Sequence, residues 1–289
     1  MIEVKGLTKE FKNGKGLFDI NFQVKQGEIF GFIGPNGAGK STAIRHLMGF
    51  LKPDKGRARI SNFDCWGEST KIKGHLGYLP GEIVFPSGMS AVDFINLQED
   101  LYKIKERSRA EELIERFQLN IHIPIKNMSK GMKQKLAIVV AFMCDPDILI
   151  LDEPSTGLDP LMQKELIGLL VEEKTKGKTI ILSSHIFEEI ENIADKICII
   201  KDGKIIKSQG IREAYDQMKK TLIVRFTENE NLSKLATPYQ KKEDNSYHIE
   251  IDNNENEVIR ELAKYKVESL EMKKTSLSEV FEHHYMGGN

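Results

Sequence analysis

Apolar and polar residues alternate singly along the first 26 residues, with turn residues at Asn13-Gly14 and Gly16. This period of two is typical of strands that bury one face. The next stretch, Glu28–Ile33, is almost entirely apolar and indicates a buried strand. The pattern therefore predicts a small antiparallel sheet that leads into this strand. A further strand pair within Gly56–Cys65 and a short strand at Leu76–Leu79 are predicted in the same way.

The spacing of apolar residues becomes helical between about residues 90 and 144, where Pro124 interrupts it and another helix is predicted from Gly131. From Asp147 onwards, short apolar runs alternate with helical segments. The predicted elements are a central parallel strand at Ile148–Leu151, a helix from Pro160 to about Lys176, a strand at Thr179–Leu182, a helix at His185–Ile193 and a hairpin over Lys196–Lys207. Strands that alternate with helices predict an α/β fold whose parallel sheet carries helices on both faces.

The character of the chain changes again after about residue 220. The elements predicted there are strands at Thr221–Phe226 and Tyr247–Ile251, and helices at Glu255–Tyr265 and Ser276–His284. We therefore expect one large domain over residues 1–215 and a small α+β domain over residues 220–289.

The charge balance argues against one class of function. With 42 basic and 43 acidic residues among 289, the chain has a formal net charge of −1. A protein that binds nucleic acid through a broad surface needs an excess of basic residues. We therefore expect no nucleic-acid partner.

The cysteines and the apolar runs indicate the redox compartment of the chain and whether it spans a membrane. Cys65, Cys144 and Cys198 lie far apart without paired spacing, which favours buried free thiols in a reducing compartment. The N-terminus has the pattern of a strand and not of a signal peptide. The longest apolar run, Leu136–Cys144, has nine residues, whereas a membrane span needs about 18. We expect a chain that is soluble by itself or is held at a membrane by another protein.

One segment carries a specific chemical pattern. The run Gly34-Pro35-Asn36-Gly37-Ala38-Gly39-Lys40-Ser41-Thr42 fits the phosphate-binding pattern G-x-x-x-x-G-K-[ST]. Its glycines let backbone N–H groups turn inward around a phosphate. The helix that opens at Lys40 adds free N–H groups and its positive dipole end.

The same segment supplies side chains for a nucleotide and a metal. Lys40 would reach the β- and γ-phosphates, and the Ser41 hydroxyl would bind Mg²⁺. A glycine-rich turn without function is the alternative, but it does not account for the flanking strand and helix. We expect the chain to bind a nucleoside triphosphate through the loop residues Gly34, Asn36, Gly37, Ala38, Gly39, Lys40, Ser41 and Thr42.

A second pattern ends the apolar strand at Ile148–Leu151 with two carboxylates, Asp152 and Glu153. Ligands of open α/β sheets bind at the carboxyl ends of the strands, which places this pair beside the phosphate loop. Asp152 can hold Mg²⁺ directly or through water, and Glu153 can polarise an attacking water. A strand followed by a solvated acidic turn is the alternative for the pair taken alone.

The order of these segments resembles that of the ATP-binding-cassette (ABC) ATPases. The resemblance rests on Gly34–Thr42, Ser129–Gln134, Asp152–Asp159 and His185, and covers residues 1 to about 215. More narrowly, the chain resembles the ATP-binding subunits of bacterial exporters of drugs, antibiotics or peptides. The resemblance implies a P-loop NTPase (RecA-like) core, an antiparallel β subdomain and a helical subdomain at about residues 82–145 that receives the membrane subunit. It also implies ATP and Mg²⁺ as cofactors.

The resemblance further implies a head-to-tail pair of ATPase subunits, with each ATP between the phosphate loop of one and the signature segment of the other. The signature here is Met128-Ser129-Lys130-Gly131-Met132, against Leu-Ser-Gly-Gly-Gln in the family. Ser129, Lys130 and Gly131 are expected to meet the facing nucleotide, although Lys130 and Met132 depart from the pattern. Asp159 occupies the position of the intersubunit aspartate. Taken alone, the segment also fits an ordinary helix cap at Ser129.

Three more residues have implied roles. His185 matches the switch histidine of the family, a catalytic residue that is expected to contact the γ-phosphate. The alternative is a surface histidine at the end of a strand. Phe11 stands where the family stacks an aromatic ring on adenine, and a core-facing strand residue is the alternative. Glu82 follows Tyr78-Leu79-Pro80-Gly81, where the family usually has glutamine. It either contacts Mg²⁺ or its water, or is a solvated turn residue.

These implications predict an ATPase subunit that powers efflux through a separate multi-span membrane permease. It would be cytoplasmic, on the inner face of the cell membrane, and paired with a second copy or a related chain. A soluble ABC ATPase that acts in translation or DNA maintenance is the alternative. A C-terminal domain that regulates the cassette is compatible with either.

Overall fold

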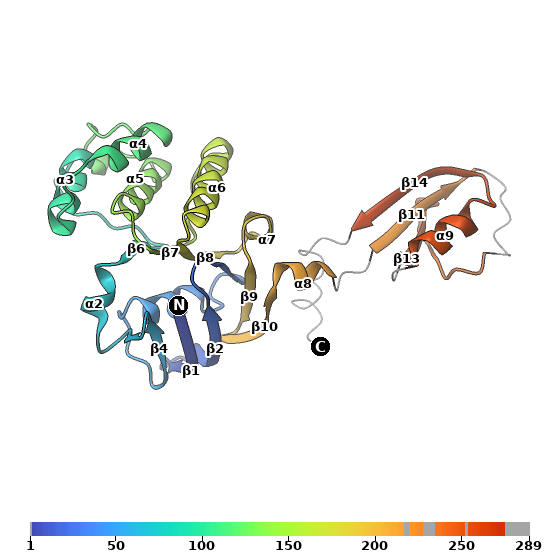
Figure 1. Ribbon diagram of the computed structural model, residues 1–289, viewed down its shortest axis with the longest axis horizontal. Coiled ribbons are helices and arrows are strands. Elements are labelled where there is room, and N and C mark those ends of the chain that lie inside the picture. Colours follow the sequence, from blue (N-terminus) through green and yellow to red (C-terminus); the bar gives the residue numbers. More distant parts are fainter. Residues whose placement is uncertain (1, 217–219, 228–234, 252–253, 275–289) are drawn as a thin grey trace. The chain divides into compact units, whose positions relative to one another are not determined.

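The computed structural model describes residues 2–216, 220–227, 235–251 and 254–274. The chain divides into two compact units, Met1–Ile211 and Arg212–Asn289 (Figure 1). Each unit has a hydrophobic core of its own. Over the described ranges, none of the helices has the length and apolar character needed to cross a bilayer.

An antiparallel sheet with the strand order β2-β1-β4-β5 forms one layer of the larger unit. Its strands are β1 (Ile2–Glu10), β2 (Gly16–Val24), β4 (Lys55–Ile60) and β5 (Phe63–Asp64). A register shift between Val4 and Leu7 keeps both residues buried. The predicted antiparallel sheet is confirmed.

The second layer is a sheet with the strand order β10-β9-β3-β8-β7-β6. Its strands are β3 (Ile29–Ile33), β6 (Leu76–Leu79), β7 (Ile148–Asp152), β8 (Thr179–Ser184), β9 (Lys196–Lys201) and β10 (Lys204–Gly210). All neighbours pair in parallel except β9 and β10, which form the predicted antiparallel hairpin. The parallel sheet is thus confirmed.

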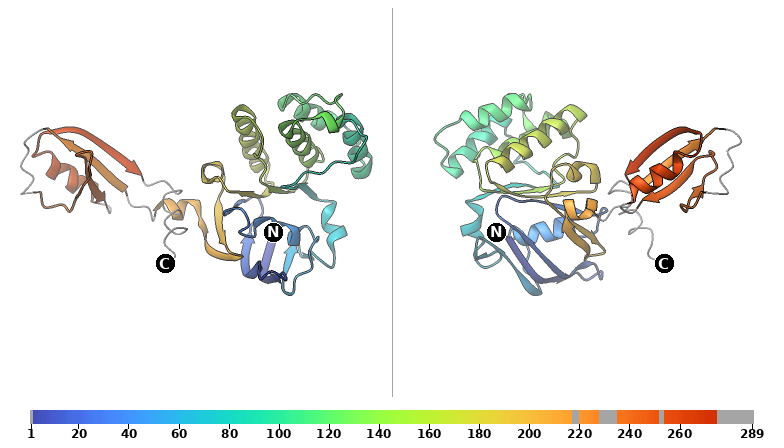
Figure 2. Two further views of the ribbon diagram at one scale, coloured as in Figure 1. Left: turned by 180° about the vertical axis from the view of Figure 1, so that it is seen from behind. Right: turned by 45° about the vertical axis from the view of Figure 1, so that its right-hand side comes forward.

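Helices cover both faces of this sheet. Ala43, Ile44 and Leu47 of α1 share a core with both sheets, whereas α5 and α6 lie on the opposite side of the parallel sheet from β1, β2 and β4 (Figures 1 and 2). The helices of the larger unit are α1 (Lys40–Leu47), α2 (Ser69–Lys73), α3 (Ala91–Tyr102), α4 (Ser108–Arg116), α5 (Lys130–Phe142), α6 (Pro160–Thr175) and α7 (Phe187–Glu191), with a 3-10 turn at Ile125–Asn127; α8 (Ile211–Asp216) begins where the two units divide. The helix predicted over His185–Ile193 is therefore shorter than expected.

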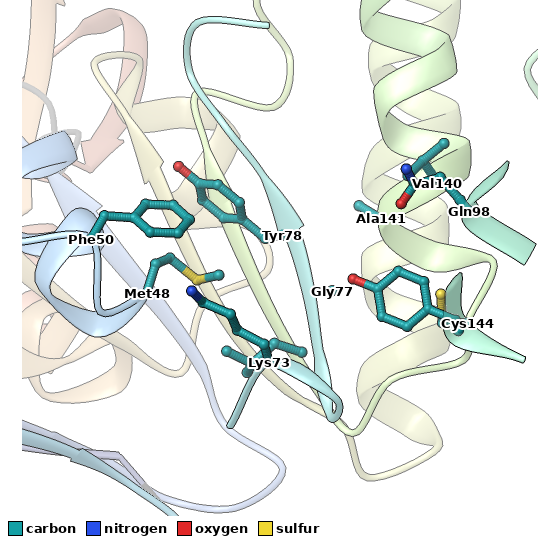
Figure 3. A pocket seen from close by; sticks show the side chains of 11 residues that line it. Met48, Phe50, Lys73, Gly77, Tyr78, Gln98, Val140, Ala141 and Cys144 are labelled. Carbon is teal, nitrogen blue, oxygen red and sulfur yellow. The ribbon is translucent and has the colours of Figure 1, made fainter. Parts of the chain in front are cut away.

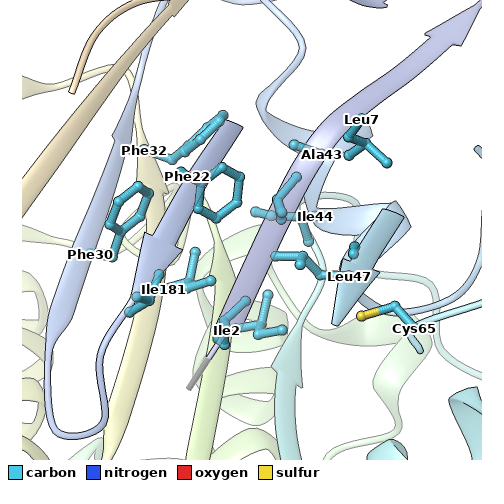
Figure 4. Close-up of a cluster of buried hydrophobic side chains, with 14 of the residues drawn as sticks. Ile2, Leu7, Phe22, Phe30, Phe32, Ala43, Ile44, Leu47, Cys65 and Ile181 are labelled. Carbon is cyan, nitrogen blue, oxygen red and sulfur yellow. The ribbon is translucent and has the colours of Figure 1, made fainter. Parts of the chain in front are cut away.

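Three phenylalanines pack together within the otherwise mainly aliphatic core between the two sheets (Figure 4). The Phe22 ring of β2 stacks on the Phe30 ring of β3, with 5.1 Å between centroids, and Phe32 lies next to both. Each buried phenylalanine contributes about 1.5–3 kcal/mol. On the other face of β3, a Cβ on Gly31 would lie 2.1 Å from the Ile190 side chain of α7. Glycine at this position therefore lets α7 pack directly on the sheet.

A buried ionic cluster joins α4 to α6. Glu173 of α6 is only 1% exposed and lies within 2.6 Å of Arg109 of α4, 2.9 Å of Lys176 and 3.1 Å of Lys178. Lys178 also pairs with Asp145, which follows α5. One buried carboxylate of α6 thus connects α4 with Lys178, the residue that precedes β8.

The smaller unit is a four-stranded antiparallel sheet with the order β12-β13-β11-β14. Its elements are β11 (Lys220–Phe226), β12 (Gln240–Lys241), β13 (Tyr247–Ile251), α9 (Glu255–Leu262) and β14 (Val267–Lys274). Leu222, Val224 and Ile249 of the sheet pack against Val258 and Leu262 of α9. The predicted strands and the first predicted helix are present, β14 was not predicted, and the predicted helix at Ser276–His284 lies outside the described residues.

The ionic cluster makes a prediction about stability. Replacing Glu173 by alanine removes the buried carboxylate that Arg109, Lys176 and Lys178 share, while Arg109 keeps its contact with Glu112 and Lys178 keeps its contact with Asp145. Because charge-assisted hydrogen bonds to buried donors are lost, the free energy of unfolding of the larger unit should fall by about 1–3 kcal/mol. Glu172→Ala is the matched control, because Glu172 is half exposed and Arg116 keeps its contact with Glu165; a loss of about 0–1 kcal/mol is expected. Urea denaturation of both variants measures the difference, and equal losses would contradict the assignment.

Candidate functional site

Three strands of the parallel sheet end at one edge and bring the predicted site residues together. Ile33, the last residue of β3, pairs with Ser184 of β8, and Asp152 of β7 pairs with Ser183. Gly34 follows Ile33 directly, and His185 follows Ser184. The parallel register therefore places the glycine-rich loop, the two carboxylates and the histidine at the same edge of the sheet.

The loop at residues 34–42 needs glycine at two positions for steric reasons. Gly39 has φ +114°, and a Cβ there would lie 2.8 Å from the Leu17 side chain. A Cβ on Gly34 would lie 2.4 Å from the Ile200 carbonyl oxygen. No side chain caps the N-terminus of α1, which begins at Lys40. Backbone groups and the positive end of the helix dipole thus define the inner surface of this loop.

Lys40 is buried at the centre of the site. It is 5% exposed, and its Nζ donates to the Gly34 carbonyl oxygen at 2.5 Å and to the Pro35 carbonyl oxygen at 3.4 Å. The same nitrogen lies 3.0 Å from Oε1 of Glu153. A buried ammonium group requires such partners, because desolvation of an unpaired charge is costly.

Glu153 connects Lys40 to His185. Its second oxygen, Oε2, lies 2.6 Å from His185 Nδ1, which is a hydrogen bond when Nδ1 carries the proton. Glu153 has φ +51°, an uncommon value for a non-glycine residue, and its N–H donates to the Ser183 carbonyl oxygen at 3.2 Å. The backbone thus holds the carboxylate between a cation on one side and an exposed imidazole on the other.

Asp152 lies deeper than Glu153 and is 3% exposed. Ser183 Oγ donates to Asp152 Oδ1 at 2.5 Å, which fixes the carboxylate. Ser183 was not predicted from the sequence, although a polar residue at the end of an apolar strand beside two carboxylates is a usable signal. On the other side, a Cβ on Gly81 would lie 3.0 Å from Asp152 Oδ2.

The donors at this edge fit a magnesium ion. Carboxylate and hydroxyl oxygens are the ligands that Mg²⁺ prefers, and it usually takes one or two carboxylates together with phosphate oxygens. Asp152 and Ser41 supply such oxygens. Glu82 is exposed and makes no hydrogen bond or ion pair to the described part of the chain. Within that same part, no cluster of three or more His, Cys, Asp or Glu residues could hold a metal ion by itself.

The signature segment starts α5 and packs against the loop after Glu153. Ser129 is the N-cap residue, and its Oγ accepts the Met132 N–H at 3.2 Å. A Cβ on Gly131 would lie 2.7 Å from the Gly157 carbonyl oxygen. Gln134 ends the segment that carries the family resemblance, although the sequence predicts no role for it; it is buried and donates to the Pro154 carbonyl oxygen at 2.8 Å. Gly131 therefore has a steric role within the chain itself.

Lys130 and Asp159 belong to the same surface. The aliphatic stem of Lys130 runs past Gly157, where an added Cβ would lie 3.3 Å from Lys130 Cγ. Asp159 caps α6 by accepting the N–H groups of Leu161 and Met162 at 3.1 and 3.0 Å. The predicted residues thus form two groups, one around Lys40 and one around Gly157.

Phe11 lies outside both groups. It follows β1 and is 38% exposed, and its N–H donates to the Lys15 carbonyl oxygen within its own turn. The alternative of a core-facing residue is therefore wrong.

The cysteines lie away from the reacting edge or deep in the core. Burial raises the pKa of Cys65 and of Cys198 to about 12, and raises the pKa of the half-buried Cys144 to about 11. These thiols stay protonated at neutral pH, which makes them poor nucleophiles.

Comparison with known proteins places this geometry in a family. The family model described as ABC transporter matches residues 17–156. An uncharacterised ABC transporter ATP-binding protein of Methanocaldococcus jannaschii, MJ1023, is 34% identical over 83% of this chain and 88% of its own length. The bacitracin transport ATP-binding protein BcrA of Bacillus licheniformis is 35% identical over 72% of this chain and 69% of its own.

A solved structure agrees with these sequence relatives. The dimeric, post-hydrolysis structure of the ATP-binding cassette MJ0796 bound to ADP and Pi has a TM-score of 0.67 and 25% identity, and the match covers 73% of this chain and 99% of that one. The predicted fold, a P-loop ATPase cassette with mixed α/β structure, is therefore confirmed. This chain belongs to the ABC transporter family, as an ATP-binding subunit with ATPase activity.

Proposed function

We propose that this chain binds ATP with Mg²⁺ at the edge formed by β3, β7 and β8, and hydrolyses ATP to drive efflux through a separate membrane permease. The observation that carries the proposal is Glu153, which bridges buried Lys40 and exposed His185. The cargo that we favour is a drug, an antibiotic or an antimicrobial or toxin peptide. The similarity to the bacitracin transport protein supports this class.

The residues around Lys40 have complementary roles in the proposed reaction. Lys40 and the backbone amides of residues 34–42 would bind the phosphates, with Asn36, Ala38 and Thr42 as part of the same loop. Ser41 and Asp152 would hold Mg²⁺, which offsets phosphate charge when bound, and Glu82 would contact the ion or its water. Phe11 would stack on the adenine ring.

Glu153 and His185 would carry out the chemical step. Glu153 would accept a proton from the attacking water, and His185 would orient the γ-phosphate from the opposite side. Phosphate oxygens must first replace Gly34 and Glu153 as partners of Lys40. Binding of ATP would therefore release the Glu153 carboxylate for its role as a base.

A second ATPase subunit would complete the site. Ser129 Oγ accepts the Met132 N–H, so its own O–H proton remains able to donate to a phosphate oxygen of the facing subunit. Lys130 would add positive charge there, and Gly131 would bring backbone N–H groups close. Asp159 would contact the partner beside its phosphates. The dimeric MJ0796 structure supports such a pair.

A groove beside the site suits the permease. It has a volume of about 280 Å³ and lies between Met48, Phe50 and Lys73 on one wall and Gln98, Val140 and Cys144 on the other (Figure 3). Phe50 is 49% exposed, and Tyr102, which also lines the groove, is 41% exposed. Aromatic residues that are half exposed around a hollow are typical of protein interfaces.

Strand β6 connects the groove to Asp152, the proposed metal ligand. Tyr78 of β6 packs edge-on against Phe50, with 5.7 Å between the ring centroids. Burial, with a smaller effect of the Asp152 charge, raises the pKa of Tyr78 to about 12. Three residues later, Gly81 lies against Asp152. We propose that a cytoplasmic helix of the permease occupies this groove and acts on the site through β6. The chain would thereby be held on the inner face of the membrane.

No observation favours the alternative of a soluble ATPase in translation or DNA maintenance. The relatives named above are called transport proteins, and the chain has nearly balanced charge.

Glu153→Gln tests the proposed base. Loss of a general base should lower the rate of ATP hydrolysis by about 10²–10⁴-fold. ATP binding should be retained or tightened, because the competing carboxylate is gone, and a closed dimer should accumulate with ATP. Steady-state turnover, fluorescent-nucleotide titration and size-exclusion chromatography measure these effects. Glu188→Gln, an exposed carboxylate on α7, is the control. Undiminished turnover in Glu153→Gln would exclude Glu153 as the base.

Tyr102→Ala tests the groove. Truncating an aromatic contact of this kind costs about 1–2 kcal/mol, or roughly 5–30-fold in affinity, so recovery of a multi-span membrane protein in a tagged pull-down from detergent-solubilised membranes should fall. The KM for ATP should not change. Tyr239→Ala is the matched control, since Tyr239 has the same 41% exposure and lies in the smaller unit. Equal recovery with both variants would argue against docking in this groove.

A further inference from the structure

Two separate loops carry the reacting side chains. Glu153 opens the loop between β7 and α6, and His185 opens the loop between β8 and α7. The side chains meet through one contact, at 2.6 Å, and His185 is 44% exposed. A single contact between partly exposed side chains does not by itself fix two loops, because ordering them costs conformational entropy.

One carboxylate oxygen forms hydrogen bonds with both loops. Oε2 of Glu189, on α7, accepts the Ser155 hydroxyl at 2.8 Å and the Ser184 hydroxyl at 2.8 Å. Ser155 lies two residues after Glu153, and Ser184 directly precedes His185. Both serines are buried, with 8% and 1% of their surface exposed. Glu189 therefore spans the two loops immediately behind their reacting residues.

Both serine hydroxyls donate to Glu189 Oε2, because a carboxylate oxygen has no proton and accepts only. Ser184 Oγ also accepts the Ile186 N–H at 2.9 Å, so its proton and one of its lone pairs are both engaged. Hydrogen bonds to an ionised acceptor are about twice as strong as neutral ones.

Apolar side chains surround part of this cluster. Ser155 and the partly exposed Glu189 line a pocket of about 50 Å³ whose other walls include Leu166, Leu170 and Leu182. A low local dielectric strengthens hydrogen bonds that are made and raises the cost of losing them. Loss of the Glu189 carboxylate would leave two buried hydroxyls without their acceptor.

The loop that Glu189 holds also contacts α5. The Pro154 carbonyl oxygen accepts from Gln134, and the Gly157 carbonyl oxygen abuts Gly131 at the start of α5. Ser155 lies between these two contacts in the sequence. Holding Ser155 in place therefore also restrains the position of Glu153 and the contact with the N-terminus of α5.

We propose that Glu189 is a positioning residue for ATP hydrolysis, which sets the Glu153–His185 geometry by holding Ser155 and Ser184 on one oxygen. The proposal rests on the roles proposed above for Glu153 and His185. Glu189 touches neither nucleotide nor water in this scheme and acts only through the two loops. Its removal disturbs the chemical step more than nucleotide binding, because Lys40 and residues 34–39 lie on other elements.

The experiment compares Glu189→Ala with Glu189→Gln in the full-length chain. Glu189→Ala should lower kcat by about tenfold or more, equivalent to ~1.4 kcal/mol, with the KM for ATP changed less than about twofold. The glutamine oxygen can accept both hydroxyls, so Glu189→Gln should recover most of the lost rate. Glu188→Ala removes the same charge from the same helix and should leave kcat unchanged.

A double-mutant cycle separates positioning from general destabilisation. Ser155→Ala/Ser184→Ala should lower kcat as much as Glu189→Ala does, and adding Glu189→Ala to the pair should produce no further loss. If Glu189 had only a structural role, Glu189→Ala and the serine variants would have lower melting temperatures. Their kcat would then not fall selectively, and Glu189→Gln would not restore the rate.

Either of two results would overturn the proposal. The first is a kcat for Glu189→Ala that stays within about twofold of the kcat of the unmodified chain, while Glu153→Gln is inactive. This result would refute the role of Glu189 and leave the proposed function intact. The second is additive losses in the cycle. If Glu153→Gln itself retained full turnover, the proposed function would fail first, and this inference with it.

Discussion

The contact between Lys40 and Glu153 is the constraint on which the site depends. Lys40 follows β3 and Glu153 follows β7, and both residues lie at the carboxyl edge of the sheet because both strands run parallel to β8. Each residue carries a charge and is largely buried. An uncompensated charge at 5% exposure would cost several kcal/mol. The pair therefore holds the glycine-rich loop and the β7 carboxylate edge together, and in the proposed function a phosphate would replace Glu153 as the partner of Lys40.

The loop at residues 153–159 connects the Lys40–Glu153 contact to several other elements of the larger unit. It contacts β8 through Ser183, α5 through Gln134 and Gly131, and α7 through Glu189. On the other side of Asp152, Gly81 continues into β6 and the aromatic groove. Asp152 and Glu153 therefore belong to a segment that contacts β8, α5, α7 and Gly81. In the proposed function, a change on nucleotide binding at the edge and a change on permease binding at the groove would act on the same few atoms.

The sequence predicted those parts of the fold that local periodicity controls. The buried strands and long helices were found because their apolar spacing is unambiguous over several turns. The helix at His185–Ile193 was predicted too long, because Ser184 Oγ binds the Ile186 N–H and holds residues 185 and 186 out of the helix. β14 was missed because Val267–Lys274 is mostly exposed and becomes a strand through pairing with β11, which no local pattern reveals.

The site could be predicted as a set of residues but not as an arrangement. The phosphate-loop pattern and the strand ending in Asp152-Glu153 were readable because chemistry dictates residue types there. The partners Ser183, Gln134 and Glu189 were not, because each acts across loops far apart in the sequence. The sequence predicts an intersubunit contact for Ser129 and Asp159, and within the chain itself both residues cap helices.

The most direct test of the central claim is a structure of the chain with Mg²⁺ and a non-hydrolysable ATP analogue. The account predicts that Lys40 Nζ leaves Glu153 and the Gly34 carbonyl oxygen for the β- and γ-phosphate oxygens. Glu153 should then face a water in line with the γ-phosphate while still meeting His185. A Lys40–Glu153 contact that persists unchanged with the analogue bound would contradict the account, since the carboxylate would then be a structural partner and not a base released by nucleotide.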